Sequence, residues 1–205
     1  MHQGPPDPRE GYRVGILALQ GGFLEHNLAL HRLGVRAKEV RLPQDFEGLQ
    51  GLIIPGGEST TIASLIDHYD LREPIIRHAQ EGMAVWGTCA GMILVAKSLK
   101  EDRPVPLGLM DIVVSRNAFG RQVDSFEREI DVEGLEGGPF HAVFIRAPSV
   151  LDVGSDVRVL ARLGDGIPVA MQQKRFLCTA FHPELTSDSR LHTYFLTMLE
   201  RTSEV

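Results

Sequence analysis

Short apolar runs alternate with amphipathic stretches along the first half of the chain. The apolar runs are typical of buried parallel strands, and they lie at residues 13–19, 37–42, 51–54 and 83–86. Apolar side chains at helical spacing predict helices at residues 23–33, 61–69, 74–80 and from 92 to about 99. The resulting order, β-α-β-β-α-β-α, predicts an α/β fold with a doubly wound, mostly parallel sheet.

The second half of the chain is richer in strand patterns. We expect strands at residues 110–115, 129–132, 142–146, 157–162, 168–172 and 176–181, followed by a closing helix at residues 189–201. These strands predict a mixed or partly antiparallel extension of the sheet. Residues 115–126 fit neither period, and we expect an ordered loop there, of the kind that often carries function.

Length and composition favour one soluble domain. Residues 1–11 are rich in proline and charge, so we expect a disordered extension there and a single domain over residues 12–205. The net charge of -6, without a Lys/Arg cluster, argues against nucleic acid as a partner. We find no signal peptide, and no apolar run approaches the roughly 20 residues of a membrane span.

The cysteine content points to a reducing compartment. The chain has only two cysteines, Cys89 and Cys178, which are too few for a disulfide framework. No Cys/His spacing suggests zinc, so we expect neither a metal nor a cofactor. Free thiols are typical of the cytoplasm, where we place the protein. Cys178 lies inside a predicted strand and is interpreted as a core residue.

The pattern Gly87-Thr88-Cys89-Ala90-Gly91 is the thiol counterpart of the Gly-x-Ser-x-Gly nucleophile elbow. It stands between a predicted strand and a predicted helix. Such a turn strains the nucleophile's backbone and requires small neighbours, while the following helix directs N–H groups at the sulfur and stabilises a thiolate. The alternative is a buried structural cysteine in a tight turn.

Other candidate residues also follow predicted strands. Gln20, the turn at residues 56–59 and Cys89 each lie at the carboxyl end of one. In a doubly wound sheet these ends meet at one edge, where the site lies. This convergence favours a functional Cys89.

A nucleophilic cysteine needs a base, and His182 is the strongest candidate. His182 and Glu184 flank Pro183 just after an apolar strand. In an extended segment they share a face, so the carboxylate can accept the imidazole N–H and fix its tautomer. An exposed His-Pro-Glu turn is the alternative. The remaining histidines are interpreted as solvated or capping side chains: His2, His26, His31, His68, His78, His141 and His192.

The turn Gly56-Gly57-Glu58-Ser59 can complete an acyl-transfer site. A tetrahedral oxyanion needs N–H donors from the residue after the nucleophile and from a nearby strand-end loop. Here these donors are the amides of Ala90 and Gly57. The alternatives are a plain glycine-rich turn or a weak phosphate loop, although the turn lacks the spacing of a nucleotide-binding loop.

Taken together, these motifs resemble the class I (triad) glutamine amidotransferases. The more specific resemblance is to the glutaminase subunits of pyridoxal 5′-phosphate synthase, and it extends from about Arg13 to the last helix. It rests on Gly-Thr-Cys-Ala-Gly and on residues 18–21, 55–60, 116–122, 144–148 and 181–185. The resemblance implies a three-layer α/β/α, flavodoxin-like fold and hydrolysis of L-glutamine to L-glutamate and ammonia.

The resemblance also implies roles for single residues. Cys89, His182 and Glu184 match the catalytic triad, and Gly57 with Ala90 matches the oxyanion hole. The positions that match glutamine-contacting residues are Gly57, Glu58, Ser59, Arg116, Ile145 and Arg146. Gln20 matches a loop beside the oxyanion hole and the partner interface. The implied partner is a barrel-shaped synthase subunit in a large hetero-oligomer, which uses the ammonia to build pyridoxal 5′-phosphate.

Other functions remain open at this point. A glutaminase of another pathway, such as imidazole glycerol phosphate synthase, would share the triad, but the motif at residues 116–122 argues against it. A stand-alone thiol hydrolase or protease would need no partner. A redox sensor or chaperone with a reactive cysteine would not need His182 or Glu184.

Overall fold

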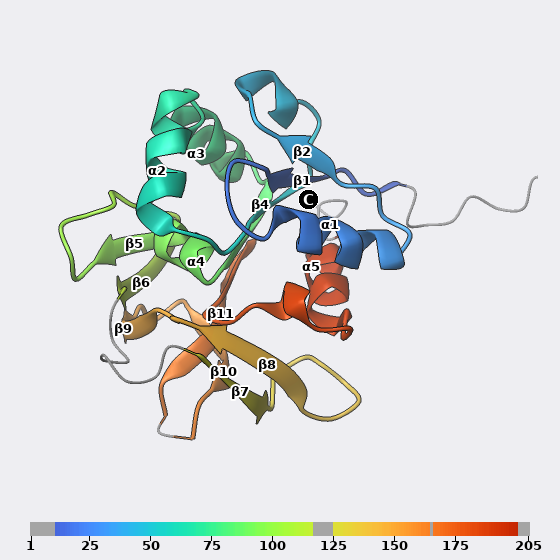
Figure 1. Cartoon of the computed structure of the whole chain (residues 1–205), viewed down its shortest axis with the longest axis vertical. Helices are drawn as coiled ribbons and strands as arrows, with labels where there is room; N and C mark the ends of the chain where they lie inside the picture. Colours follow the sequence, from blue (N-terminus) through green and yellow to red (C-terminus); the bar gives the residue numbers. More distant parts are fainter. Residues whose placement is uncertain (1–10, 117–124, 165, 201–205) are drawn as a thin grey trace, which may run out of the picture.

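A sheet of seven strands forms the centre of the protein, for which a computed structural model describes residues 11–116, 125–164 and 166–200 (Figure 1). Its strands are β1 (Val14–Leu17), β2 (Lys38–Val40), β3 (Gly51–Ile54), β4 (Ala84–Thr88), β10 (Arg158–Arg162), β11 (Pro168–Gln173) and β12 (Phe176–Thr179). They run in the order β10-β11-β12-β4-β3-β1-β2. The sheet therefore joins the first and last parts of the sequence.

The pairing within this sheet is mostly parallel. β1 pairs in parallel with β2 and β3, and β4 pairs in parallel with β3 and β12. β10 and β11 continue the sheet as antiparallel strands. The expectation of a parallel sheet with an antiparallel extension is confirmed. Every residue of β1, β3 and β4 is buried, as a strand covered on both faces requires.

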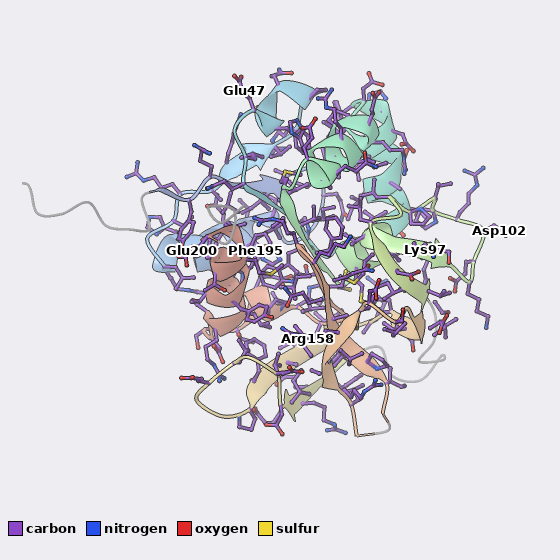
Figure 2. All side chains as sticks on the ribbon, turned by 180° about the vertical axis from the view of Figure 1, so that it is seen from behind. Glu47, Lys97, Asp102, Arg158, Phe195 and Glu200 are labelled. Carbon is purple, nitrogen blue, oxygen red and sulfur yellow. The ribbon has the colours of Figure 1, made fainter. Side chains whose placement is uncertain are left out.

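Helices cover both faces of the sheet and give three layers (Figure 1). One side carries α1 (Phe23–Arg32) and α5 (Arg190–Glu200), and the other carries α2 (Ser59–His68), α3 (Arg72–Gln80) and α4 (Ala90–Val95). Trp86 of β4 is fully buried and packs against Phe195, with ring centroids 5.5 Å apart. Phe195 is labelled on α5 in Figure 2. The flavodoxin-like, three-layer expectation is confirmed.

The prediction of a helix up to residue 99 is wrong. α4 ends at Val95, and Ala96 turns to extended backbone with φ -54° and ψ 153°. Residues 96–99 form β5 (Ala96–Leu99), which pairs with β6 (Met110–Ser115). β6 also pairs with β9 (Ser149–Val153), which the sequence analysis did not predict. In β5, Ala96 is buried and Leu99 packs against the core, whereas Lys97 and Ser98 are exposed.

The remaining strands form a hairpin that is separate from the main sheet. β7 (Ser125–Ile130) and β8 (Phe140–Ile145) pair antiparallel with each other and do not join the seven-stranded sheet. Their apolar side chains pack on the chain after β12: Phe144 stacks on Phe126 at 4.6 Å and lies 5.4 Å from Phe181. The hairpin buries one face only, which favours a small sheet beside the main one.

Two expectations fall partly outside the described residues. The structure describes nothing of residues 1–10, which make up nearly all of the predicted extension, or of residues 117–124 within the predicted loop. The last residue of the predicted closing helix, 201, also lies outside. Among the residues that are described, no helix is long and apolar enough to cross a membrane.

Candidate active site

The predicted elbow lies at the turn from β4 to α4. Cys89 has the strained backbone angles φ 49° and ψ -106°, and its N–H donates to Thr179 O of β12 at 2.8 Å. The chain folds back on itself so tightly that a Cβ on Gly87 would lie 2.5 Å from Gly91 O. These contacts explain the glycines on either side of the cysteine.

His182 and Cys89 lie together at the carboxyl edge of the sheet. A Cβ on Gly56 would touch both side chains, at 2.3 Å from His182 Cε1 and 3.2 Å from Cys89 Cβ. Cys89 Sγ also lies 3.7 Å from Ile145 O, and only 6% of the residue is exposed. The thiol is therefore held between the base, a carbonyl and the glycine turn.

Glu184 completes the row of side chains behind the thiol. Its Oε1 lies 2.7 Å from His182 Nδ1, and the carboxylate is almost fully buried. The expected reason for this contact is wrong, since the segment does not stay extended: a 3₁₀ turn, η3 (Pro183–Leu185), begins directly after His182. The backbone N–H of His182 donates to Val143 O at 2.9 Å, which ties the turn to β8.

The site favours a charged imidazole. Burial by itself would lower the pKa of His182, but hydrogen bonds with Cys89 and Glu184 raise it to about 10. Burial would likewise raise the pKa of Glu184, but the hydrogen bond with His182 and the charge of the imidazolium lower it. An imidazolium flanked by a carboxylate and a sulfur stabilises the thiolate, which is the nucleophilic form of cysteine.

The glycine turn at residues 56–59 lies against the elbow and against Gln20. Gly56 N donates to Thr88 Oγ1 at 3.0 Å, and Glu58 N donates to Gln20 Oε1 at 2.8 Å. A Cβ on Gly57 would lie 2.4 Å from that same oxygen and 3.1 Å from Gly21 Cα, so a side chain there would displace Gln20. Over residues 11–116, 125–164 and 166–200, the amides of Gly57 and Ala90 have no protein acceptor. Both are available to an oxyanion.

Glu58 and Arg116 form an ion pair beside this turn. Glu58 caps α2 by accepting from Thr61 N at 2.7 Å, and its Oε1 lies 3.3 Å from Arg116 Nη2. The hydrogen bond from Thr60 is the largest cause that lowers the pKa of Glu58, which falls to about 2. Ser59 is buried at the first position of α2. The fixed carboxylate holds the guanidinium, whose Nη1 also donates to Arg103 O at 3.0 Å.

Ile145 and Arg146 lie at the end of β8. The Ile145 carbonyl faces the Cys89 sulfur, as described above. Arg146 has φ 44°, which is unusual for a residue with a side chain, and it is exposed. The structure thus brings Ile145 to the thiol through its backbone, and it leaves the Arg146 side chain in solvent next to it.

Two further histidines lie buried behind the site and were not predicted from the sequence. His26 of α1 and His192 of α5 are fully buried, so their interpretation as solvated or capping residues is wrong. His26 Nε2 lies 3.4 Å from Glu184 Oε2, and His26 Nδ1 lies 3.0 Å from His192 Nε2. A signal was present, because His26 shares a helical face with the buried Ala29 and Leu30.

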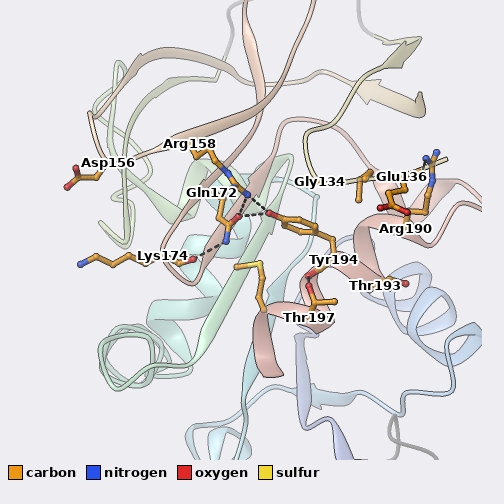
Figure 3. A pocket seen from close by; sticks show the side chains of 12 residues that line it. Gly134, Glu136, Asp156, Arg158, Gln172, Lys174, Arg190, Thr193, Tyr194 and Thr197 are labelled. Carbon is orange, nitrogen blue, oxygen red and sulfur yellow. Dashed lines mark hydrogen bonds between the residues drawn. The ribbon is translucent and has the colours of Figure 1, made fainter. Parts of the chain in front are cut away.

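A separate cavity of about 830 Å³ lies between α5, the edge strand β10 and its neighbour β11 (Figure 3). Arg158 Nη2 donates to Tyr194 OH at 2.7 Å, and Tyr194 OH donates to Gln172 at 2.5 Å. None of its lining residues is a predicted site residue. Among the residues the structure describes, no cluster of His, Cys, Asp and Glu could hold a metal ion.

The chain is similar in sequence to a known protein family and to curated relatives. The sequence pattern of the SNO glutamine amidotransferase family matches residues 16–201. The chain belongs to this family. Over 186 residues it is 58% identical to "Pyridoxal 5′-phosphate synthase subunit PdxT" of Herpetosiphon aurantiacus, covering 89% of this chain and 98% of the relative. A protein of the same name from Thermus thermophilus is 57% identical over 185 residues, or 89% of this chain and 95% of that one.

Solved structures place this SNO family member in the same fold. A crystal structure of a glutamine amidotransferase superposes with a TM-score of 0.86 at 53% identity, over 91% of this chain and 98% of that one. The structure of PurLQS from Thermotoga maritima superposes with a TM-score of 0.70 at 16% identity, over 92% of this chain and 99% of the matched chain. The second likeness concerns the fold alone.

Proposed function

We propose that this chain is the glutaminase subunit of a pyridoxal 5′-phosphate synthase. It hydrolyses L-glutamine to L-glutamate and ammonia, and a synthase subunit consumes the ammonia. The row Cys89, His182, Glu184 at the carboxyl edge of the sheet is the observation that carries the proposal. Relatives more than half identical over nearly their whole length are named as subunits of that synthase, which supports the choice of pathway.

The reaction proceeds through a thioester. The Cys89 thiolate attacks the side-chain carboxamide carbon of glutamine, and the amides of Gly57 and Ala90 hold the oxyanion. His182 as imidazolium gives its proton to the leaving nitrogen, and ammonia departs. The neutral imidazole then takes a proton from water, whose oxygen attacks the thioester and releases glutamate. Glu184 keeps the His182 ring oriented through both steps.

Charged side chains around the thiol suit the amino-acid end of glutamine. Arg116 and Arg146 carry guanidinium groups that bind carboxylates in a bidentate way. Glu58 fixes Arg116 in place, with 3.3 Å between Oε1 and Nη2. Gly57 and Ser59 belong to the turn that leads into α2 beside the elbow, and the Ile145 carbonyl lies 3.7 Å from the sulfur. These six residues form the proposed glutamine site.

The partner is a barrel-shaped synthase subunit in a large hetero-oligomer. Two features near the site support a docking face. Gln20 and the start of α1 contact the oxyanion turn, so a protein bound there acts directly on the catalytic geometry. On the outer side of α1, Leu24 and Leu28 lie one turn apart and are 55% and 62% exposed. Residues 12–205 act as one glutaminase domain in the cytoplasm, where the free Cys89 thiol stays reduced.

Glutamate release from L-glutamine tests this proposal, measured with and without the cognate synthase subunit. We expect low activity alone, a strong rise on adding the synthase, and no activity for Cys89→Ala. Full activity without the synthase would favour an uncoupled hydrolase. No activity under either condition would favour a redox sensor or chaperone and would overturn the proposal.

A further inference from the structure

Glu184 uses only one of its two carboxylate oxygens to contact His182. Its other oxygen, Oε2, is buried and has no conventional hydrogen-bond partner over the described part of the chain. His26 Nε2 lies 3.4 Å from this oxygen. His26 is itself fully buried, so neither group has water as a substitute partner. A buried carboxylate oxygen is costly unless a donor faces it.

The surroundings of His26 determine which of its nitrogens carries the proton. Burial lowers the pKa of His26 and lowers that of His192 well below the usual value, which favours the neutral form of both rings. A neutral ring has one N–H. Glu184 Oε2 can only accept, so the proton belongs on Nε2 of His26. The bare Nδ1 then accepts from His192 Nε2, which lies 3.0 Å away.

His26 also reaches the glycine turn through Thr88. Its Nε2 lies 3.2 Å from Thr88 Oγ1, and the same oxygen accepts from Gly56 N at 3.0 Å. Gly56 in turn packs against His182 and Cys89. One imidazole N–H therefore faces both the triad carboxylate and the threonine that holds the turn beside the nucleophile.

We propose that His26 is a positioning residue of the glutaminase: its Nε2–H holds the second oxygen of Glu184, and His192 fixes the tautomer that makes this possible. The inference rests on the proposed function, because it assigns a role within that triad. The row of groups then runs from His192 of α5 through His26 of α1 to Glu184, His182 and Cys89.

A purely structural role is the competing explanation. The His26 ring packs edge-on against Trp86, with centroids 5.6 Å apart, and it fills the space between α1 and β4. The charged groups that act on it are Glu184, His182 and, on its own helix, Glu25. A residue that only fills space would tolerate an apolar replacement without changing how activity depends on pH.

The test compares His26→Gln with His26→Leu. The Gln amide nitrogen takes the place of imidazole Nε2 and still donates to Glu184, whereas Leu fills the space without a donor. We expect His26→Leu to lower kcat roughly 10- to 100-fold with little change in KM, and His26→Gln to stay within about 5-fold of the parent. A carboxylate without its donor has a raised pKa, so the acid limb of kcat/KM should move to higher pH in His26→Leu alone.

Two readouts separate this inference from the proposed function. The first is the rate of Cys89 alkylation by iodoacetamide as a function of pH, which needs no glutamine and should show the same shift in His26→Leu. The second is long-range ¹H–¹⁵N NMR of the unmodified protein, in which we expect His26 in the neutral Nε2–H form. An Nδ1–H or charged His26, or a pH profile unchanged in His26→Leu, would overturn the inference even if glutamine is hydrolysed.

Discussion

Gly91 lies against Ile54 so closely that a Cβ on Gly91 would be 1.9 Å from the Ile54 carbonyl oxygen. This contact joins the first turn of α4 to the end of β3, the strand that leads into the glycine turn. The nucleophile and the oxyanion donors therefore come from two adjacent strand ends that are locked together by backbone packing. A side chain at Gly91 would push them apart.

Gly91→Ala is expected to destabilise the protein. A methyl group cannot fit at 1.9 Å from a backbone oxygen, so β3 or α4 must shift, and overpacking of this kind costs about 1–3 kcal/mol. Urea denaturation measures the change in unfolding free energy. Gly164→Ala is the matched control, because a Cβ there meets no atom within 4 Å and the residue has no positive φ. Equal stability of the two variants would contradict the packing argument.

The two cysteines should respond differently to removal. Cys89→Ala is expected to abolish glutamine hydrolysis, since no other group can form the thioester. Cys178→Ala removes the second thiol, which is fully buried in β12 and whose pKa is raised by burial. It should keep its kcat and lose some stability. Glutamate release measures the first effect and thermal unfolding the second. If Cys89→Ala released glutamate at the same rate as the parent protein, the mechanism would be refuted.

Much of this site is predictable from sequence because its residues follow strands that are apolar on both faces. β1, β3 and β4 stand out for that reason, and the polar or glycine residues at their ends mark the site edge. The contact between His182 and Glu184 was expected from an extended segment, yet a 3₁₀ turn produces it. The two side chains meet in either geometry. The predicted contact is therefore present, although the extended backbone from which it was predicted is not.

What the sequence does not reveal depends on partners far along the chain. The helical pattern around His26 can signal that the residue is buried, but it cannot reveal the contacts with Thr88 and His192, which are 62 and 166 positions away. β9 has no clear alternation because its burial is set by pairing with β6, whose register shifts within the strand. Local patterns carry no information about such contacts.

Glu184→Gln should narrow the pH range of activity. Glu184 and Cys89 raise the pKa of His182 to about 10, so the imidazolium that protonates the leaving nitrogen persists well above neutral pH. Without the carboxylate charge that pKa falls, and the alkaline limb of kcat moves to lower pH. We expect a loss of roughly 10- to 100-fold at neutral pH, smaller than in Cys89→Ala. An unchanged alkaline limb would mean that Glu184 does not stabilise the charged ring.

We expect Arg116→Ala and Arg146→Ala each to raise KM for glutamine about 10-fold or more, with a smaller effect on kcat. Each substitution removes a guanidinium group that can bind the substrate carboxylate through two hydrogen bonds. Arg128→Ala is the control, since Arg128 lies exposed on β7 and its nearest recorded contacts are its neighbour Glu127 and the Phe126 ring. Steady-state kinetics of glutamate release separate the two parameters. If Arg146→Ala left KM unchanged, Arg146 would have no role in substrate binding.

Leu28→Asp tests the docking face on α1. Leu28 is 62% exposed, so the substitution should leave folding and the basal glutaminase rate unchanged. Burying the new carboxylate against a partner is unfavourable, so the synthase should bind at least 10-fold more weakly and stimulate hydrolysis only at higher concentration. Leu151→Asp is the matched control, because Leu151 is 52% exposed on β9, away from α1 (Figure 1). Titration of glutamate release with the synthase measures both variants. If the synthase stimulated glutamate release by Leu28→Asp at the same concentration at which it stimulates the parent protein, this side of α1 would not belong to the interface.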